Sequence, residues 1–295
     1  MRLDAETLEF ARTFELVNRE TLLVGRAFTE HEVQVAGPAG QLTMSVFTPE
    51  RRTSPSPGIY WIHGGGMVMG TRFGALEAID LADAVGGVVA SLEYRLAPEH
   101  PAPAPGDDCD AGLCWFAEHA GELGVDADRI VLAGSSAGGG LAAGAALRSR
   151  DRGGPSLAGL LLSSPMLDDR MATVAANQFG EDIVWTRAAN EFGWRSLLGA
   201  RMGTEEVTSY EVPGRATDLS DLPPTLIDVG SADLFRDEDV AFASRIWASG
   251  GDCELHVWPG GYHGFELFVP TAALSIDAVE ARRRWLRRSL AKVAT

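Results

Sequence analysis

The chain has 295 residues, of which 45% are hydrophobic and 22% charged, values typical of a globular protein that folds throughout its length. Its 25 basic and 41 acidic residues give a formal net charge of −16, which disfavours nucleic acid and anionic lipid as partners. The sequence shows no signal-peptide pattern and no membrane-spanning apolar stretch, so the protein is expected to be cytoplasmic. Its three cysteines lack metal-type spacing and are expected to be free thiols.

The pattern of apolar residues along the chain predicts an α/β fold in one domain, 1–295. A helix is expected over roughly 4–24, and residues 30–48 form two alternating strands around a Gly-Pro-Ala-Gly turn, which predicts an antiparallel hairpin. From about residue 57, buried-strand runs alternate with helical stretches, which predicts a mostly parallel central sheet with helices on both faces. The strand candidates are 59–62, 88–93, 129–134, 158–164, 225–230 and 254–258, and the helix candidates are 75–85, 107–122, 137–150, 237–249 and 272–293.

A long insertion before the strand at 225–230 and a basic run in the last helix do not follow from the alternation of strands and helices. Residues 166–220 lie between two strands and are far longer than an ordinary crossover, and they contain Trp185, Phe192 and Trp194. This insertion is either a lid over a pocket near the carboxyl ends of the strands or extra core packing, and both interpretations stay open. In the last helix, the basic run Arg282 to Arg284 predicts a solvated helix face.

The strand at 129–134 runs directly into GSSAG, residues 134–138, which puts Ser136 in a G-x-S-x-G pattern with a helix following at once. A serine at such a turn lies in strained backbone and needs small neighbours, here Gly134, Gly138 and Gly139. The start of the helix also presents backbone N–H groups, notably that of Ala137, where an oxyanion would develop. The pattern predicts Ser136 as a nucleophile.

HGGG, residues 63–66, follows the strand at 59–62 and is a rarer string by chance than G-x-S-x-G. Consecutive glycines allow close approach of the backbone to a ligand, so Gly64, Gly65 and Gly66 are candidates for an oxyanion hole together with Ala137. A glycine loop that merely turns the chain is the structural alternative. We expect His63 to stabilise this loop by hydrogen bonding and not to act as the base.

A serine hydroxyl requires a base within hydrogen-bond reach, and His263 lies just beyond the last strand, at the edge of the sheet where Ser136 is expected. The orienting acid should follow another strand, and Asp233 is the first acid after the strand at 225–230, whereas Asp228 lies inside that strand and is expected to point at another layer. The acids that come next are expected in the first turn of a helix: Asp237, Glu238 and Asp239. The order Ser136, Asp233, His263 is that of α/β-hydrolases and predicts a triad acting through an acyl-enzyme.

These residues resemble the hormone-sensitive-lipase group of bacterial esterases, family IV of the lipolytic enzymes. Five ordered motifs carry the resemblance over about residues 30–290: HGGG at 63, YRLAPEHP at 94, GSSAGG at 134, DLFRDE at 233 and HGF at 263. The resemblance implies a carboxylic-ester hydrolase for short or medium acyl chains, with no cofactor; the cysteine spacing likewise predicts no metal site. It also implies a cap, built from about residues 1–28 and 170–215.

Within that resemblance, Tyr94, Arg95 and Glu99 of the YRLAPE motif are expected to be structural. The sequence departs from the family pattern at Ser135, where an acid usually precedes the nucleophile, and at Met67, where an aromatic residue is frequent. Met67 predicts a more adaptable acyl pocket.

Three alternatives to an esterase stay open. A lactonase or a deacetylase would use the same triad, because substrate choice depends on the cap. A small-molecule receptor would keep the pocket without turnover, although all three triad residues are present here. A small-molecule ester is the expected partner, and the resemblance also leaves open a homodimer through an edge strand.

Overall fold

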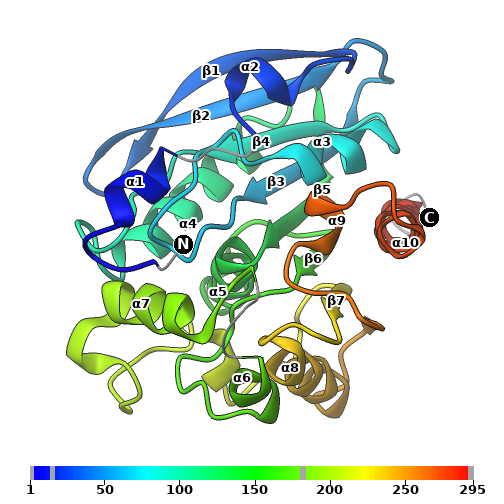
Figure 1. Ribbon diagram of the computed structural model, residues 1–295. Helices are drawn as coiled ribbons and strands as arrows, with labels where there is room; N and C mark the ends of the chain where they lie inside the picture. The colour runs from blue at the N-terminus through cyan, green and yellow to red at the C-terminus, as the bar shows by residue number, and fades with distance from the viewer. Residues whose placement is uncertain (1–2, 14–16, 180–183, 292–295) are drawn as a thin grey trace.

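A single eight-stranded sheet runs through the centre of the molecule (Figure 1). The computed structural model describes residues 3–13, 17–179 and 184–291. The strands are β1 (Phe28–Gly37), β2 (Gly40–Pro49), β3 (Ser56–Ile62), β4 (Val88–Leu92), β5 (Val125–Ser135), β6 (Gly159–Ser163), β7 (Thr225–Gly230) and β8 (Cys253–Trp258). They are ordered β1-β2-β4-β3-β5-β6-β7-β8 across the sheet.

The predicted hairpin forms the first edge of this sheet. β1 and β2 pair antiparallel from Phe28 opposite Pro49 to Gly37 opposite Gly40, and β2 also pairs antiparallel with β4. All pairs from β4 to β8 are parallel. The mostly parallel sheet expected from the sequence is therefore confirmed.

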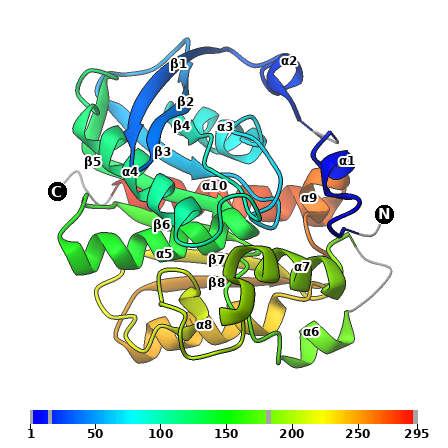
Figure 2. The same ribbon diagram turned by 90° about the vertical axis from the view of Figure 1, so that its left-hand side faces the viewer.

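Helices cover both faces of the sheet (Figure 2). They are α1 (Leu8–Arg12), α2 (Arg19–Leu22), α3 (Leu76–Asp83), α4 (Ala104–Glu118), α5 (Ala137–Arg152), α6 (Val174–Gln178), α7 (Arg187–Leu198), α8 (Arg236–Ala248), α9 (Phe265–Phe268) and α10 (Ala273–Ala291). Along β3, Trp61 packs in one buried cluster with α3 and α10, while Tyr60 and Ile62 pack in the other with α4, α5 and α8. Because both faces are buried, the strands are apolar at nearly every position.

The parallel register brings distant parts of the chain to one edge of the sheet. The loop 63–66 follows β3, Ser136 follows β5, Asp233 follows β7 and His263 follows β8. Carboxyl ends of parallel strands meet at the same edge, so residues up to two hundred positions apart become neighbours there. Figure 2 shows α1, α7 and α9 gathered along this edge.

The N-terminal segment differs from the single helix expected over 4–24. Within the described residues, it forms two short helices, α1 and α2. Asn18 adopts an extended conformation, φ −124° and ψ 178°, and its side chain accepts hydrogen bonds from the amides of Glu20 and Thr21. An asparagine N-cap of this kind starts a new helix and therefore interrupts an existing one.

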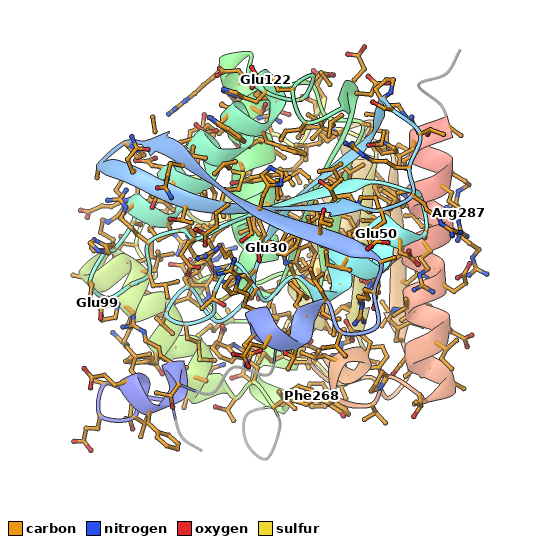
Figure 3. The ribbon with its side chains drawn as sticks, turned by 90° about the horizontal axis from the view of Figure 1, so that it is seen from above. Glu30, Glu50, Glu99, Glu122, Phe268 and Arg287 are labelled. Atoms are coloured by element: carbon orange, nitrogen blue, oxygen red, sulfur yellow. The ribbon has the colours of Figure 1, made fainter. Side chains whose placement is uncertain are left out.

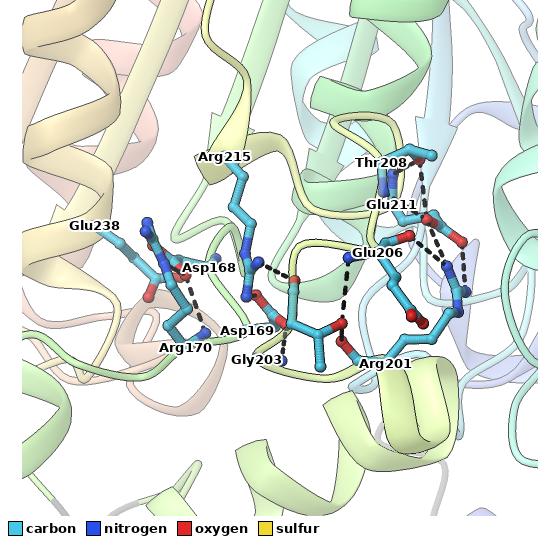
Figure 4. A network of polar contacts seen from close by, with 11 residues as sticks. Asp168, Asp169, Arg170, Arg201, Gly203, Glu206, Thr208, Glu211, Arg215 and Glu238 are labelled. Atoms are coloured by element: carbon cyan, nitrogen blue, oxygen red, sulfur yellow. Dashed lines mark hydrogen bonds and ion pairs between the residues drawn. The ribbon is translucent and has the colours of Figure 1, made fainter.

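The insertion between β6 and β7 contains α6, α7 and two 3₁₀ turns, Gly199–Arg201 and Pro213–Arg215. Polar contacts, drawn in Figure 4, organise its irregular parts. Asp169 is fully buried, lies 2.7 Å from the Arg215 guanidinium and accepts from the Gly203 amide at 2.7 Å, while Arg201 pairs with Glu211 at 2.6 Å. Buried backbone without regular structure needs such side-chain partners.

Both interpretations of the insertion find residues that fit them. Trp194 is completely buried in the main core, as extra core packing would require. Trp185 instead lines the cavity beside Ser136. The described helices include none with the length and apolar character needed to cross a bilayer.

Candidate active site

Ser136 stands in the sharp turn between β5, which ends at Ser135, and α5, which begins at Ala137. Its backbone has φ 57° and ψ −124°, a strained conformation for a residue with a side chain. A Cβ at Gly134 would lie 2.3 Å from the Gly138 carbonyl oxygen, and a Cβ at Gly138 would lie 2.0 Å from that of Ile62. The glycines around the serine are therefore required by space, as the sequence pattern predicts.

The structure brings Ser136, His263 and Asp233 together. His263 Nε2 lies 2.9 Å from Ser136 Oγ, and His263 Nδ1 lies 2.7 Å from Asp233 Oδ2. Asp233 is fully buried, and its other oxygen accepts from the Phe235 amide at 3.0 Å. The Phe235 ring also meets the imidazole edge-on, with ring centroids 5.2 Å apart. The carboxylate is thus immobilised where it can orient the imidazole.

The surroundings of His263 favour its protonated form. Burial by itself lowers the pKa of the imidazole, but the adjacent Asp233 carboxylate and, to a smaller extent, Glu266 raise the pKa above its ordinary value. An imidazole that gains stability on protonation is suited to take a proton from a hydroxyl.

The glycine loop after β3 lies against the turn that carries the serine. Gly65 and Gly66 have φ of 114° and 64°, and a Cβ built on Gly64 would be 3.2 Å from Ser136 Cβ. Within the described residues, the backbone N–H groups of Gly65, Gly66 and Ala137 donate to no protein acceptor. Unpaired amides beside a nucleophile can stabilise an oxyanion.

His63 supports this loop, as expected. Its Nδ1 lies 2.9 Å from the Gly64 carbonyl oxygen, and its ring stacks on Tyr94 with centroids 4.2 Å apart. The Tyr94 hydroxyl donates to the His63 carbonyl oxygen at 2.9 Å. Burial lowers the pKa of His63 to about 4, so the ring is neutral near pH 7.

The other residues of the YRLAPE motif also make structural contacts. Arg95 pairs with the buried Asp108 at 2.7 Å. Glu99 receives two hydrogen bonds from Arg12 of α1, at 2.7 and 2.8 Å. Arg12 additionally donates to the carbonyl oxygens of Val68 and Ala97, so the motif attaches the N-terminal segment to the glycine loop.

A cavity of about 370 Å³ opens over the serine. Its wall includes Ser136, His263, Gly64 and Gly65, together with Ala11 and Arg12 of α1 and Val184 and Trp185 of the insertion. Apolar cavities of this size suit small organic ligands. Met67 is buried and is not part of the wall, so the expectation that it shapes an acyl pocket finds no support; Met69 lines the cavity instead.

The acids that follow Asp233 lie at the start of α8, as predicted. Glu238 accepts from the backbone amides of Leu167 and Asp168 at 2.8 and 3.2 Å, which ties the insertion to α8. No group of three or more His, Cys, Asp and Glu side chains within the described part of the chain could hold a metal ion.

The prediction of a solvated face for Arg282 to Arg284 is wrong for Arg282, whose side chain is 2% exposed. Its Nε bonds to Asp228 at 2.9 Å, and further contacts reach Glu77 and Glu266. The sequence contains a signal for this burial. Arg282 shares a helix face with Ala278, Trp285 and Leu286, all of which are buried.

Asp228 points toward α10 and not toward His263, as expected for a residue inside the strand. It faces α10, where it meets Arg282 and accepts from the Trp258 indole N–H at 2.9 Å. Sequence reasoning missed that Glu77, Glu266 and Arg282 line the same cavity as the serine.

Known proteins resemble this chain in both sequence and structure. A family model described as alpha/beta hydrolase fold matches residues 59–267. Esterase LipI of Mycobacterium tuberculosis is 36% identical over 255 residues, which cover 82% of this chain and 77% of that protein. Carboxylesterase NlhH of the same organism is 35% identical over 251 residues, covering 79% and 74%.

Among solved structures, a bacterial heroin esterase superposes with a TM-score of 0.90 at 35% identity, covering 98% of this chain and 94% of that one. Esterase LipW from Mycobacterium marinum superposes with a TM-score of 0.86 at 32% identity, covering 96% and 88%. The likeness therefore extends over nearly the whole chain.

Proposed function

Since the chain belongs to the hormone-sensitive-lipase-like esterases of the α/β-hydrolase family, we propose that it hydrolyses short and medium acyl esters through Ser136, His263 and Asp233. One observation carries the proposal. His263 lies within hydrogen-bond distance of both Ser136 Oγ and Asp233, beside a cavity of about 370 Å³.

The proposed reaction follows from these distances. His263 Nε2 accepts the Ser136 proton while the hydroxyl oxygen attacks the ester carbonyl. The oxyanion of the tetrahedral intermediate is stabilised by the backbone amides of Gly65, Gly66 and Ala137. Gly64 is part of the same glycine loop. The imidazolium then protonates the leaving alcohol, and water attacks the acyl-enzyme by the same route to release the acid.

Two segments are proposed to form the cap that selects the acyl chain, about residues 1–28 and 170–215. Ala11, Arg12 and Val17 come from the first segment, and Val184 and Trp185 from the second, and all five line the cavity. A cap with two walls limits the length of chain that fits, which favours short and medium esters.

Hydrolysis of a p-nitrophenyl ester series from acetate to palmitate tests the proposal, with Ser136→Ala and His263→Ala as controls. We expect turnover that declines with chain length and is lost in both variants. A folded wild type without turnover on any ester of the series would overturn it. Turnover of lactones or acetylated amines alone would assign the triad to one of those reactions.

A further inference from the structure

Four ionisable side chains from four elements meet beside the proposed triad, and three of them, Arg282, Glu77 and Glu266, line the same cavity as Ser136. Arg282 of α10 contacts Asp228 of β7, Glu266 of α9 and Glu77 of α3, with shortest distances of 2.9, 2.8 and 3.1 Å. Arg282 and Asp228 are 2% and 1% exposed, and Glu77 and Glu266 are 18% and 15% exposed. The planar guanidinium of arginine is pre-organised for such contacts, so several carboxylate partners restrict its orientation.

The partners of Arg282 flank the triad along the chain. Asp228 lies in β7, five residues before Asp233, and Glu266 lies three residues after His263. Gly264, with φ 70°, connects His263 to α9, and Glu266 is the second residue of that helix. Figure 1 shows α9 between the ends of the strands and α10. Arg282 thus connects the strand that presents the acid to the short helix that follows the base.

We propose that Arg282 is a positioning residue for His263: through Glu266 and Asp228 it anchors the base loop, residues 259–264 between β8 and α9, to β7, the strand that precedes Asp233. This inference rests on the proposed function and adds to it a residue outside the triad. Its physical basis is that a displacement of about 1 Å in a catalytic group can reduce turnover roughly a hundredfold.

Hydrogen bonds also hold the loop that carries His263, and the contribution of the Arg282 ion pair is judged against them. The Ala232 amide donates to the Gly261 carbonyl oxygen at 2.8 Å, which attaches the start of the loop to the end of β7. On the far side of His263, the Phe265 amide donates to the Tyr262 carbonyl oxygen at 3.0 Å, a contact within the loop itself. From that side, the ion pair between Glu266 and Arg282 and a 3.5 Å hydrogen bond from Ser275 Oγ to the Phe265 carbonyl oxygen both link the loop to α10.

The charges around His263 give the proposal a second readout. Asp233 faces it from the loop after β7 and Glu266 from α9. The same cavity is lined by His63, whose pKa burial lowers to about 4, by Glu77, whose pKa burial raises to about 7, and by Arg282. Glu238 and Asp239 of α8 lie near Asp233, and burial raises the pKa of both carboxyls well above their ordinary values. Burial raises the pKa of Glu266, but the charge of Arg282, hydrogen bonds to the carboxyl and the charge of His263 together hold it below its ordinary value.

Three variants, together with one control, separate a positioning role of Arg282 from a role in general stability. Arg282→Lys keeps a positive charge but lacks the planar fork that reaches Asp228 and Glu266 together, so we expect kcat to fall roughly ten- to a hundredfold with KM nearly unchanged. Glu266→Ala removes the link and should lower kcat similarly. Glu266→Gln keeps a carbonyl oxygen that accepts from Arg282 and should restore most of the turnover.

Glu266→Gln also removes a negative charge that raises the pKa of His263. The acid limb of its kcat/KM profile should therefore move to lower pH, a shift that a purely structural role would not produce. Arg287→Lys is the matched control. Arg287 lies on the outer side of the same helix, half exposed, and pairs with Glu280 at 3.3 Å (Figure 3), so both readouts should stay at wild-type values.

Thermal unfolding establishes that each variant is folded, and an NMR titration of His263 measures the coupling without any ester. Wild-type kcat in both Arg282→Lys and Glu266→Ala would overturn the proposal, as would a His263 titration that is the same in Arg282→Lys as in the wild type. A wild type without esterase activity, but with a His263 titration that changes in Arg282→Lys, would refute the proposed function while retaining the anchor.

Discussion

His263 must be neutral to accept the Ser136 proton, so its titration governs how activity depends on pH. Because Asp233 and Glu266 raise the pKa of His263 above 6.5, the protonated, inactive form persists to higher pH than for an ordinary histidine. We expect kcat/KM to fall as the pH drops through a value above 6.5. A pH profile on a short p-nitrophenyl ester checks this, and an acid limb at or below 6.5 would contradict it.

Glu77 gives a prediction about stability. Burial raises its pKa to about 7 despite the nearby Arg282, with Glu266 adding to the increase. The folded state therefore retains a proton that the unfolded chain releases, and stability falls as the pH rises from about 4.5 to about 7. Glu77→Gln removes this titration, so its stability relative to wild type should increase over that window.

Urea unfolding at several pH values measures this difference. Glu280→Gln is the control, since Glu280 is an exposed carboxyl on α10 that pairs with Arg287. Parallel curves for wild type and Glu77→Gln would show that the buried carboxyl does not titrate in this range.

The Tyr94 hydroxyl supports the glycine loop through one buried hydrogen bond to the His63 carbonyl oxygen. Tyr94→Phe leaves that acceptor without its partner and should cost about 1–2 kcal/mol in the free energy of unfolding. Tyr210→Phe provides a comparison, because the Tyr210 hydroxyl bonds to Asp151 in an exposed position. Equal losses for the two variants in urea unfolding would refute the special role of Tyr94.

At the scale of elements, α1 is attached to the body of the protein by Arg12, which bonds to Glu99, Val68 and Ala97 and lines the cavity. Arg12→Met removes these bonds and should loosen one wall of the proposed cap. We expect KM for medium-chain esters to rise several-fold while acetate is little affected, because only longer chains reach that wall.

Steady-state kinetics across the ester series tests this, with Arg19→Met as control, since Arg19 of α2 is 61% exposed and pairs with Glu30. The same loss of kcat on every ester, with KM unchanged, would exclude a role for α1 in chain selection.

Elements are also where sequence and structure can be compared most directly. The strand and helix candidates from residue 57 onward agree with β3 to β8 and with α3, α4, α5, α8 and α10 to within a few residues. They agree because a strand buried on both faces and a helix with one apolar face each have a local signature. The helix expected over 4–24 was wrong because Asn18 begins a new helix, a signal that is easily hidden in a polar segment.

At the scale of the whole molecule, the two ends of the chain differ in what they contribute. α10 buries Trp285, Leu286 and Leu290 against the sheet and supplies the cation for Asp228 and Glu77. Fully burying one such apolar side chain contributes roughly 1.5–3 kcal/mol, so losing three of them is comparable with a typical total stability of about 5–15 kcal/mol. Deletion of residues 273–295 should therefore abolish cooperative unfolding.

Deletion of residues 1–24, in contrast, removes α1 and α2 but none of the sheet, and the protein should still unfold cooperatively with an altered chain-length preference. Circular dichroism melts and the ester series measure both outcomes. An unfolded product of the N-terminal deletion, or unchanged activity and preference, would show that this segment has another role than a cap.

The sequence by itself determined the class of fold and pointed to Ser136, Asp233 and His263, because strand and helix periodicity is local and each motif follows a recognisable strand. Only the tertiary structure decided that Arg282 is buried among Asp228, Glu77 and Glu266. A basic run on a helix looks the same in sequence whether it faces water or a carboxylate from another element. Whether such an arginine is exposed or buried depends on packing between segments far apart in the chain. Packing of this kind also placed Trp185 on the cavity wall and Trp194 in the core.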